Sequence, residues 1–300
     1  MKLLPLVLAT AVTAVGMTSA QAASSRIDKI KSTGEITLGY RESSIPFSYL
    51  DDNQKPIGYS MDICHGVVDA LKKDLKMPNI KIKLVSVTSS TRIPLVANGT
   101  VDLSCGSATN NAQRQVQVSF APTTFVTATR FTALKKSNLN DLKDFKGKTV
   151  VSTSGTTNLK WLTKTNADEH LGMRIIPAKD HSEAFLTVGS GRASAFFMDD
   201  ILLAGLVANS RNPGDWMISK KAYTIEPYGI IEPKGDPQFK TAVDNAVKAM
   251  MKDGKLDELY AKWFTKPIPP KNINLNWPMT PELKKAIAHP TDSPDPEVYK

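Results

Sequence analysis

The sequence predicts an α/β protein of two lobes, each a mostly parallel sheet flanked by helices, joined by two hinge crossings. Two series of alternating strand-like and helix-like segments, over residues 35–104 and 148–208, predict the two sheets. Two further strand-like stretches, 125–134 and 223–231, predict the crossings. Because ligands of such sheets bind at the carboxyl ends of the strands, we expect a cleft between the lobes and a hinge motion.

The first series supplies the first lobe. Apolar residues recur at helical spacing from Ile63 to Leu75, which predicts a helix capped by Ser60 or Asp62. Apolar residues alternate with lysines over 80–84, a pattern typical of a half-buried strand. The other elements predicted here are helices at 27–30 and 93–98 and strands at 35–40 and 101–104.

The second series and the C-terminal part follow the same logic. Strands are predicted at 148–151, 174–176 and 193–198, and helices at 182–189 and 201–208. Beyond the second crossing, Asp236-Pro237 marks a helix start, and Leu256, Leu259 and Trp263 share one face of a last helix. The tail is rich in proline and polar residues and is expected to wrap the surface.

The N-terminus has the features of a cleaved signal peptide. Lys2 precedes an apolar run over 3–15, and Ala20-Gln21-Ala22 places small residues at both required positions of the cleavage site. The run is shorter than the roughly 20 residues that a membrane span needs. An exported, soluble protein is therefore expected, organised as a signal peptide (1–22), a first lobe in two parts (23–128 and 227–265), a second lobe (129–226) and a tail (266–300).

Charge and cysteine content narrow the function classes. The net charge is +9, and it becomes +8 without Lys2, when 37 basic residues face 29 acidic ones. These basic residues are scattered and form no block of five, so we expect no nucleic-acid or anionic-membrane partner and favour a small acidic ligand. Cys64 and Cys105 are too far apart for a redox pair or a zinc site. An oxidising compartment would allow a disulfide between them, although two buried free thiols remain the alternative.

Several arginines and hydroxyl residues follow predicted strands and therefore meet at one edge of a sheet. The stretch from Cys105 to Arg114 breaks a strand at Gly106 and enters a helix, which exposes backbone N–H groups next to a guanidinium. Such a corner suits a carboxylate, and planar guanidinium groups suit it as well. The residues that predict a shared anion site are Arg41, Ser89, Arg92, Ser107, Thr109 and Arg114.

The sequence contains no motif of a known catalytic or cofactor site. It has no G-x-S-x-G, no phosphate-binding loop, no dinucleotide-binding loop and no H-E-x-x-H, so we expect no cofactor and no metal. Glu183, close to His181, is the one carboxylate that could serve as a general acid.

Seven segments of the chain resemble the periplasmic solute-binding proteins of ABC transporters for polar amino acids, and within them the glutamate/aspartate-binding branch. The resemblance spans essentially the whole mature chain, and the last of these segments is particular to that branch. The segments are 41–48, 92–95, 105–111, 154–157, 178–181, 198–200 and 268–272.

The resemblance implies the type II periplasmic-binding-protein fold and assigns roles to the site residues. The ligand's side-chain carboxylate would meet Arg41, Ser89, Arg92 and His181. Its α-carboxylate would meet Arg114, Thr109 and Thr156, and its ammonium would meet Asp199 and groups around Ser107. The partners implied are an acidic amino acid and the permease subunits of a transporter, with the protein a periplasmic monomer. Two alternatives remain, an exported enzyme on the same fold, such as a dehydratase, and a sensor that feeds a receptor.

Overall fold

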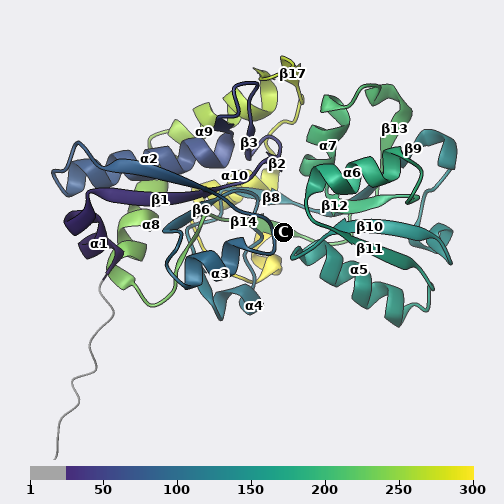
Figure 1. The fold of residues 1–300 in the computed structure, drawn as a ribbon, viewed down its shortest axis with the longest axis horizontal. Helices are drawn as coiled ribbons and strands as arrows, with labels where there is room; N and C mark the ends of the chain where they lie inside the picture. The colour runs from purple at the N-terminus through teal and green to yellow at the C-terminus, as the bar shows by residue number, and fades with distance from the viewer. Residues whose placement is uncertain (1–24) are drawn as a thin grey trace, which may run out of the picture.

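The structure, a computed structural model, describes residues 25–300. The predicted signal peptide at 1–22 lies outside the described residues. Figure 1 shows two lobes side by side, each built around its own sheet, with two strands running between them. No helix among residues 25–300 is long and apolar enough to cross a membrane. The predicted α/β fold with two lobes is confirmed.

The first lobe contains a five-stranded sheet in the order β5-β1-β6-β15-β7. Three strands are parallel, with Leu38 opposite Leu84 on one side and Leu103 on the other, and the last two are antiparallel to their neighbours. The strands are β1 (Glu35–Tyr40), β5 (Lys81–Ser86), β6 (Leu103–Cys105), β7 (Val118–Phe120) and β15 (Ile231–Pro233). The helices are α1 (Arg26–Thr33), α2 (Tyr59–Asp74), α3 (Arg92–Ala97), α4 (Ala112–Gln115), α8 (Pro237–Lys252) and α9 (Lys255–Tyr260).

The second lobe contains a sheet in the order β11-β10-β12-β9-β13, of which the first three strands are parallel. Its strands are β9 (Thr129–Leu134), β10 (Thr149–Thr153), β11 (Arg174–Ala178), β12 (Phe196–Asp199) and β13 (Trp216–Ile218). Its helices are α5 (Thr157–Asp168), α6 (His181–Gly189) and α7 (Asp200–Asn209).

The two crossings pair with each other between the lobes. Strands β8 (Phe125–Thr127) and β14 (Glu226–Tyr228) form a separate antiparallel pair. The prediction of one long strand over 125–134 is wrong, because the strand is interrupted at Ala128. The carbonyl of Ala128 accepts a hydrogen bond from the backbone of Asp200 at the start of α7, outside both sheets. The predicted first crossing therefore consists of two strands, β8 and β9, separated by Ala128.

The start of α2 also differs from the prediction. The helix begins at Tyr59, with Gly58 rather than Ser60 or Asp62 at the cap position. Both predicted capping side chains have other partners: Ser60 donates to the carbonyl oxygen of Gly106, and Asp62 accepts from Trp263. Tertiary contacts thus override the local capping signal here.

The tail packs against the first lobe and has more regular structure than the sequence predicts. It forms a small hairpin of β16 (Pro267–Ile268) and β17 (Ile273–Asn274), joined antiparallel, and the helix α10 (Pro281–Ala288). Thr280 caps α10 and Pro281 occupies its first turn, a helix signal that the prediction missed. Near the terminus, Tyr299 is buried and its hydroxyl lies 2.8 Å from that of Thr123.

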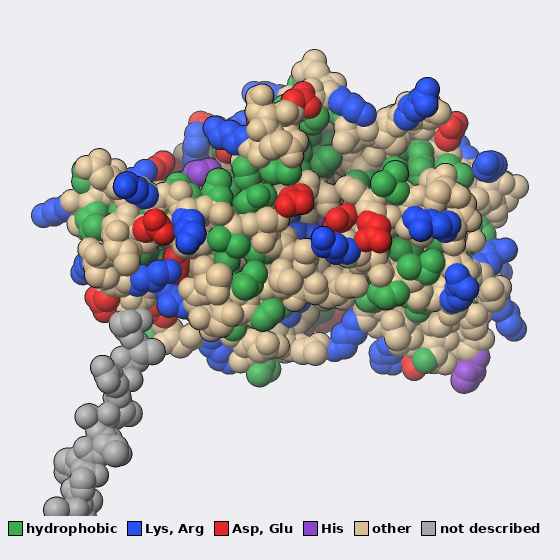
Figure 2. Space-filling view, viewed as in Figure 1, with side chains coloured by type: hydrophobic (Ala, Val, Ile, Leu, Met, Phe, Trp, Pro, Cys, Tyr) green, Lys and Arg blue, Asp and Glu red, His purple; other side chains and the backbone are tan. Residues whose placement is uncertain are grey.

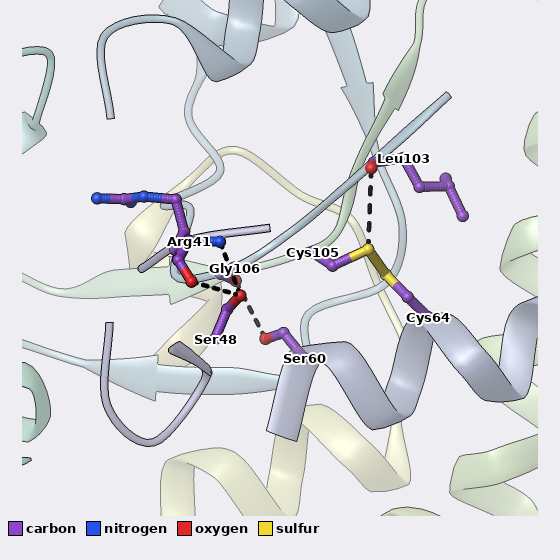
Figure 3. Close-up of a disulfide and its surroundings, with 7 residues drawn as sticks. All are labelled: Arg41, Ser48, Ser60, Cys64, Leu103, Cys105 and Gly106. Carbon is purple, nitrogen blue, oxygen red and sulfur yellow. Dashed lines mark hydrogen bonds between the residues drawn. A yellow bond between two sulfur atoms is a disulfide. The ribbon is translucent and has the colours of Figure 1, made fainter. Parts of the chain in front are cut away.

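A disulfide joins the first lobe's sheet to α2, as predicted. Cys64 and Cys105 have Cα atoms 6.2 Å apart, and both are fully buried. Figure 3 shows the bond between α2 and the end of β6, one turn along the helix from Ser60, which contacts Gly106. The bond therefore ties down the strand end from which the predicted anion-binding loop departs.

Candidate ligand-binding site

Three arginines from three separate segments are buried at the carboxyl-end edge of the first lobe's sheet. Arg41 follows β1, Arg92 opens α3 after β5, and Arg114 lies in α4 after β6. Their exposed fractions are 1%, 2% and 7%. Burial of a guanidinium is costly unless an anion or several acceptors compensate its charge.

Protein acceptors satisfy only part of this arginine cluster. Arg92 donates through Nη1 to the carbonyl oxygen of Ser107 at 2.7 Å, and Arg114 donates through Nη1 to that of Thr109 at 2.7 Å. Within residues 25–300, five buried polar atoms of the predicted site residues have no hydrogen-bond partner. They are Arg41 Nη1, Ser89 Oγ, Arg92 Nε, Ser107 Oγ and His181 Nε2.

The electrostatics of the cluster favour an anion. Burial lowers the pKa of Arg41 to about 10. Burial, with the positive charges of Arg114 and Arg41, places the pKa of Arg92 well below its usual value. Burial and the charges of Arg41 and Arg92 also hold the pKa of His181 well below its usual value. These effects favour the neutral imidazole of His181, whose Nδ1 lies 2.9 Å from the hydroxyl of Thr153.

The second lobe supplies the acidic groups of the site. Asp199, at the end of β12, accepts hydrogen bonds from Asn158 Nδ2 at 2.6 Å and from the hydroxyl of Tyr228. Burial and the nearby carboxylate of Glu226 raise the pKa of Asp199 to about 8. Glu226 itself accepts from the hydroxyl of Thr157 at 2.8 Å. A cation in this region would relieve the repulsion between the two carboxylates.

These groups surround one small cavity between the lobes. The space between its lining atoms is about 190 Å³, part of which is open to solvent. Its lining residues are Ser89, Arg92, Ser107, Thr109, Arg114, Thr156, Thr157, Asn158, His181, Met198, Asp199 and Leu202. The structure thus brings eight of the nine predicted site residues to one cavity. The ninth, Arg41, does not line it but lies close enough to His181 to affect its pKa.

The lobes touch beside this cavity. Arg114 donates through Nη2 to the carbonyl oxygen of Gly155 at 3.1 Å, and the hydroxyls of Thr109 and Thr157 are 3.3 Å apart. A Cβ atom on Gly155, whose φ is +77°, would lie 2.5 Å from the Cα of Ser90. The cleft is therefore closed in this structure.

Local capping explains how the second lobe presents its residues. Thr156 caps α5 by accepting from the backbone of Leu159, and Asp180 caps α6 by accepting from Glu183. These caps fix the helix starts that carry Asn158 and His181 toward the cavity. Glu183 is exposed, and its carboxylate accepts the backbone N–H of Lys179 at 2.8 Å, so it too serves the start of α6.

The sequence did not identify Thr157, Asn158, Met198, Leu202, Glu226 or Tyr228 as site residues. The position of Asn158, two residues after the capping residue Thr156, was an available signal. Tyr228 had none, because it reaches Asp199 only through the pairing of the two crossings. In the described part of the chain, no group of three or more His, Cys, Asp and Glu residues could hold a metal ion.

Comparisons with known proteins agree with this geometry. The family described as bacterial extracellular solute-binding proteins, family 3, matches residues 36–266. The L-glutamate/L-aspartate-binding protein of Pseudomonas aeruginosa is 49% identical over 97% of this chain and 98% of its own length. The glutamate/aspartate import solute-binding protein of Escherichia coli is 46% identical over 91% of each chain.

A solved structure extends the likeness to three dimensions. The ancestral amino acid-binding protein described as a precursor of cyclohexadienyl dehydratase is 27% identical, with a TM-score of 0.68 over 80% of this chain and 100% of its own. The family match covers most of the chain, and two relatives are similar over nearly their full length. The chain is therefore a member of the bacterial extracellular solute-binding proteins of family 3.

Proposed function

We propose that this protein captures L-glutamate or L-aspartate between its lobes and delivers it to the permease subunits of an ABC transporter. The observation that carries the proposal is that five buried polar atoms of the predicted site residues have no hydrogen-bond partner within residues 25–300, two of them on the three buried arginines. An acidic amino acid supplies two carboxylates for the arginines and one ammonium for Asp199.

The proposed pose uses both lobes. The side-chain carboxylate meets Arg41, Ser89, Arg92 and His181. The α-carboxylate meets Arg114, Thr109 and Thr156, and the ammonium meets Asp199 and the groups around Ser107. Arg114 already contacts the second lobe through Gly155, so the α-carboxylate lies where the lobes meet.

Ligand and closure are linked in this proposal. Residues 129–226 move as one lobe against 23–128 and 227–265, about the crossings β8 and β14. Because only the closed cleft satisfies both sets of residues, the ligand shifts the population toward closure. A transporter that recognises closure then distinguishes loaded from empty protein.

The proposal also includes export to the periplasm and a small molecule as the ligand. A signal peptide at 1–22 would deliver the protein to the periplasm as a monomer. Figure 2 shows basic side chains dispersed among acidic and uncharged ones on the visible face, with no large basic patch. This distribution supports a small-molecule ligand over nucleic acid.

Calorimetric titration of ligand-stripped protein tests the proposal. Glutamate, aspartate, glutamine and asparagine are titrated separately, and we expect the two acidic amino acids to bind. Failure of both would contradict the proposal. Chromatography of the bound ligand separates a carrier from an enzyme, because a carrier returns the amino acid unchanged.

A further inference from the structure

The tail segment 268–272, the one particular to the glutamate/aspartate-binding branch, does not line the ligand cavity. Its role therefore differs from direct contact with the ligand. It lies at the tip of the hairpin formed by β16 and β17, where Ile268 pairs with Ile273. The hydroxyl of Tyr49 in the first lobe donates to the carbonyl oxygen of Pro269 at 2.6 Å, and Ile268 is buried. The hairpin is therefore a fixed part of the first lobe's surface.

Helix α7 of the second lobe ends against this hairpin. Lys271 donates through Nζ to the carbonyl oxygen of Asn209, the last residue of α7, at 2.6 Å. Carbonyl groups at a helix C-terminus lack intrahelical partners and carry partial negative charge, so a lysine is favoured there. A small crevice between the lobes is lined by Ile45, Gly205, Asn209, Ile268, Pro269, Pro270, Ile273 and Leu275.

One turn earlier, α7 approaches the first lobe through a glycine. A Cβ atom on Gly205 would lie 2.7 Å from the carbonyl oxygen of Ile45 and 3.0 Å from its Cβ. Glycine in a helix interior is less favourable than alanine. The close approach to Ile45, a backbone contact that cannot swing aside, explains why a glycine occupies this helical position.

We infer that Ile45 and the hairpin 267–274 form a docking surface for α7, an interlobe contact that closes with the cleft but does not touch the ligand. The inference rests on the proposed function, because it assumes ligand-linked closure. Helix α7 then has two roles. Leu202 lines the ligand cavity, while Gly205 and Asn209 dock on the first lobe.

The docking surface makes ligand affinity depend on residues outside the cavity. Any contact made only in the closed state adds to the stability of the ligand-bound form. Removing it therefore weakens binding even though every group that meets the ligand remains. The segment 268–272 thus acts through closure.

Glycine substitutions in the full mature chain test the inference. Gly205→Ala places a methyl group against Ile45 in the closed form only, and we expect glutamate affinity to fall about tenfold or more. Gly189→Ala is the matched control, since Gly189 also lies in a helix of the second lobe. A Cβ there meets the Trp216 ring at 3.6 Å, an ordinary contact. The control should bind glutamate as the wild type does.

Two further measurements keep the test decisive. The melting temperature of ligand-stripped Gly205→Ala should equal or exceed that of the wild type, because alanine favours the helix. Lys271→Met, which removes only the exposed cation, should weaken binding about two- to fivefold. Unchanged affinity in Gly205→Ala overturns the inference, and if that variant does not fold, unchanged affinity in Lys271→Met overturns it. The wild-type titration tests the proposed function separately, because it requires no variant.

Discussion

Replacing Arg92 with methionine separates the binding role of the arginine cluster from its effect on the fold. Methionine keeps an unbranched apolar chain about as far as the position of Nε but removes the charge and all donors. Arg92 is 2% exposed, its Nε has no partner within the described residues, and Arg114 and Arg41 repel it. In the ligand-free protein its positive charge is therefore destabilising, although the guanidinium also donates a hydrogen bond to the carbonyl oxygen of Ser107.

The expected effects on binding and stability have different signs. A hydrogen bond to a charged group contributes about 1.5–3 kcal/mol, so glutamate affinity should fall about 10- to 140-fold, since 1.4 kcal/mol is a factor of ten. The lost bond to Ser107 destabilises the ligand-free protein, whereas removal of a buried charge stabilises it. We expect the ligand-free melting temperature to stay equal or rise.

Calorimetry and thermal unfolding of Arg92→Met measure both quantities, with Arg174→Met, an exposed arginine of β11, as the control. Glutamine lacks the side-chain charge that Arg92 meets in the proposed pose, so its affinity should fall less than that of glutamate. The reasoning is refuted if glutamate binds as before, or if the affinity loss is accompanied by an equal loss of ligand-free stability.

Other consequences follow from the acidic residue, the disulfide and the hinge. Because the folded pKa of Asp199 is raised to about 8 from 3.8, the folded state holds this proton more tightly, and ligand-free stability should fall as pH rises across that interval. Glutamate affinity should rise toward pH 8 as Asp199 ionises, and Asp199→Asn should weaken binding and flatten both pH profiles; wild-type pH dependence in this variant would contradict the assignment. Replacing Cys64 and Cys105 together with alanine should lower the free energy of unfolding in urea by about 2–4 kcal/mol, and an unchanged midpoint would argue against a stabilising bond. Saturating glutamate should reduce the radius of gyration of ligand-stripped protein in small-angle scattering, and no change would count against closure.

The loops that follow strands were predictable because their signals are local. Arg41 comes directly after β1, Arg92 and Arg114 lie in the first helices after β5 and β6, and parallel strands bring their carboxyl ends to one edge. The break at Ala128 was not predictable from composition. The residues on both sides of Ala128 favour strands. The strand is interrupted there only because the chain leaves the β8–β14 pair and enters the sheet of the second lobe.

The second half of the site depended on packing between distant segments. Tyr228 reaches Asp199 because β14 pairs with β8, a contact about 100 residues apart in sequence that no local pattern encodes. The prediction of Ser60 or Asp62 as the cap of α2 was wrong for the same reason. The carboxylate of Asp62 accepts a hydrogen bond from Trp263, which comes from the far end of the chain. Local sequence signals thus predicted the anion-binding edge of the first lobe's sheet. The pocket proposed for the ligand's ammonium depends on pairing between distant segments, which those signals do not encode.

A crystal structure of the protein with glutamate bound tests the binding mode most directly. We expect one amino acid in the interlobe cavity, with its side-chain carboxylate within hydrogen-bond distance of Arg41 and Arg92 and its ammonium within that distance of Asp199. A ligand bound outside the cavity, or with its ammonium among the arginines, would contradict it.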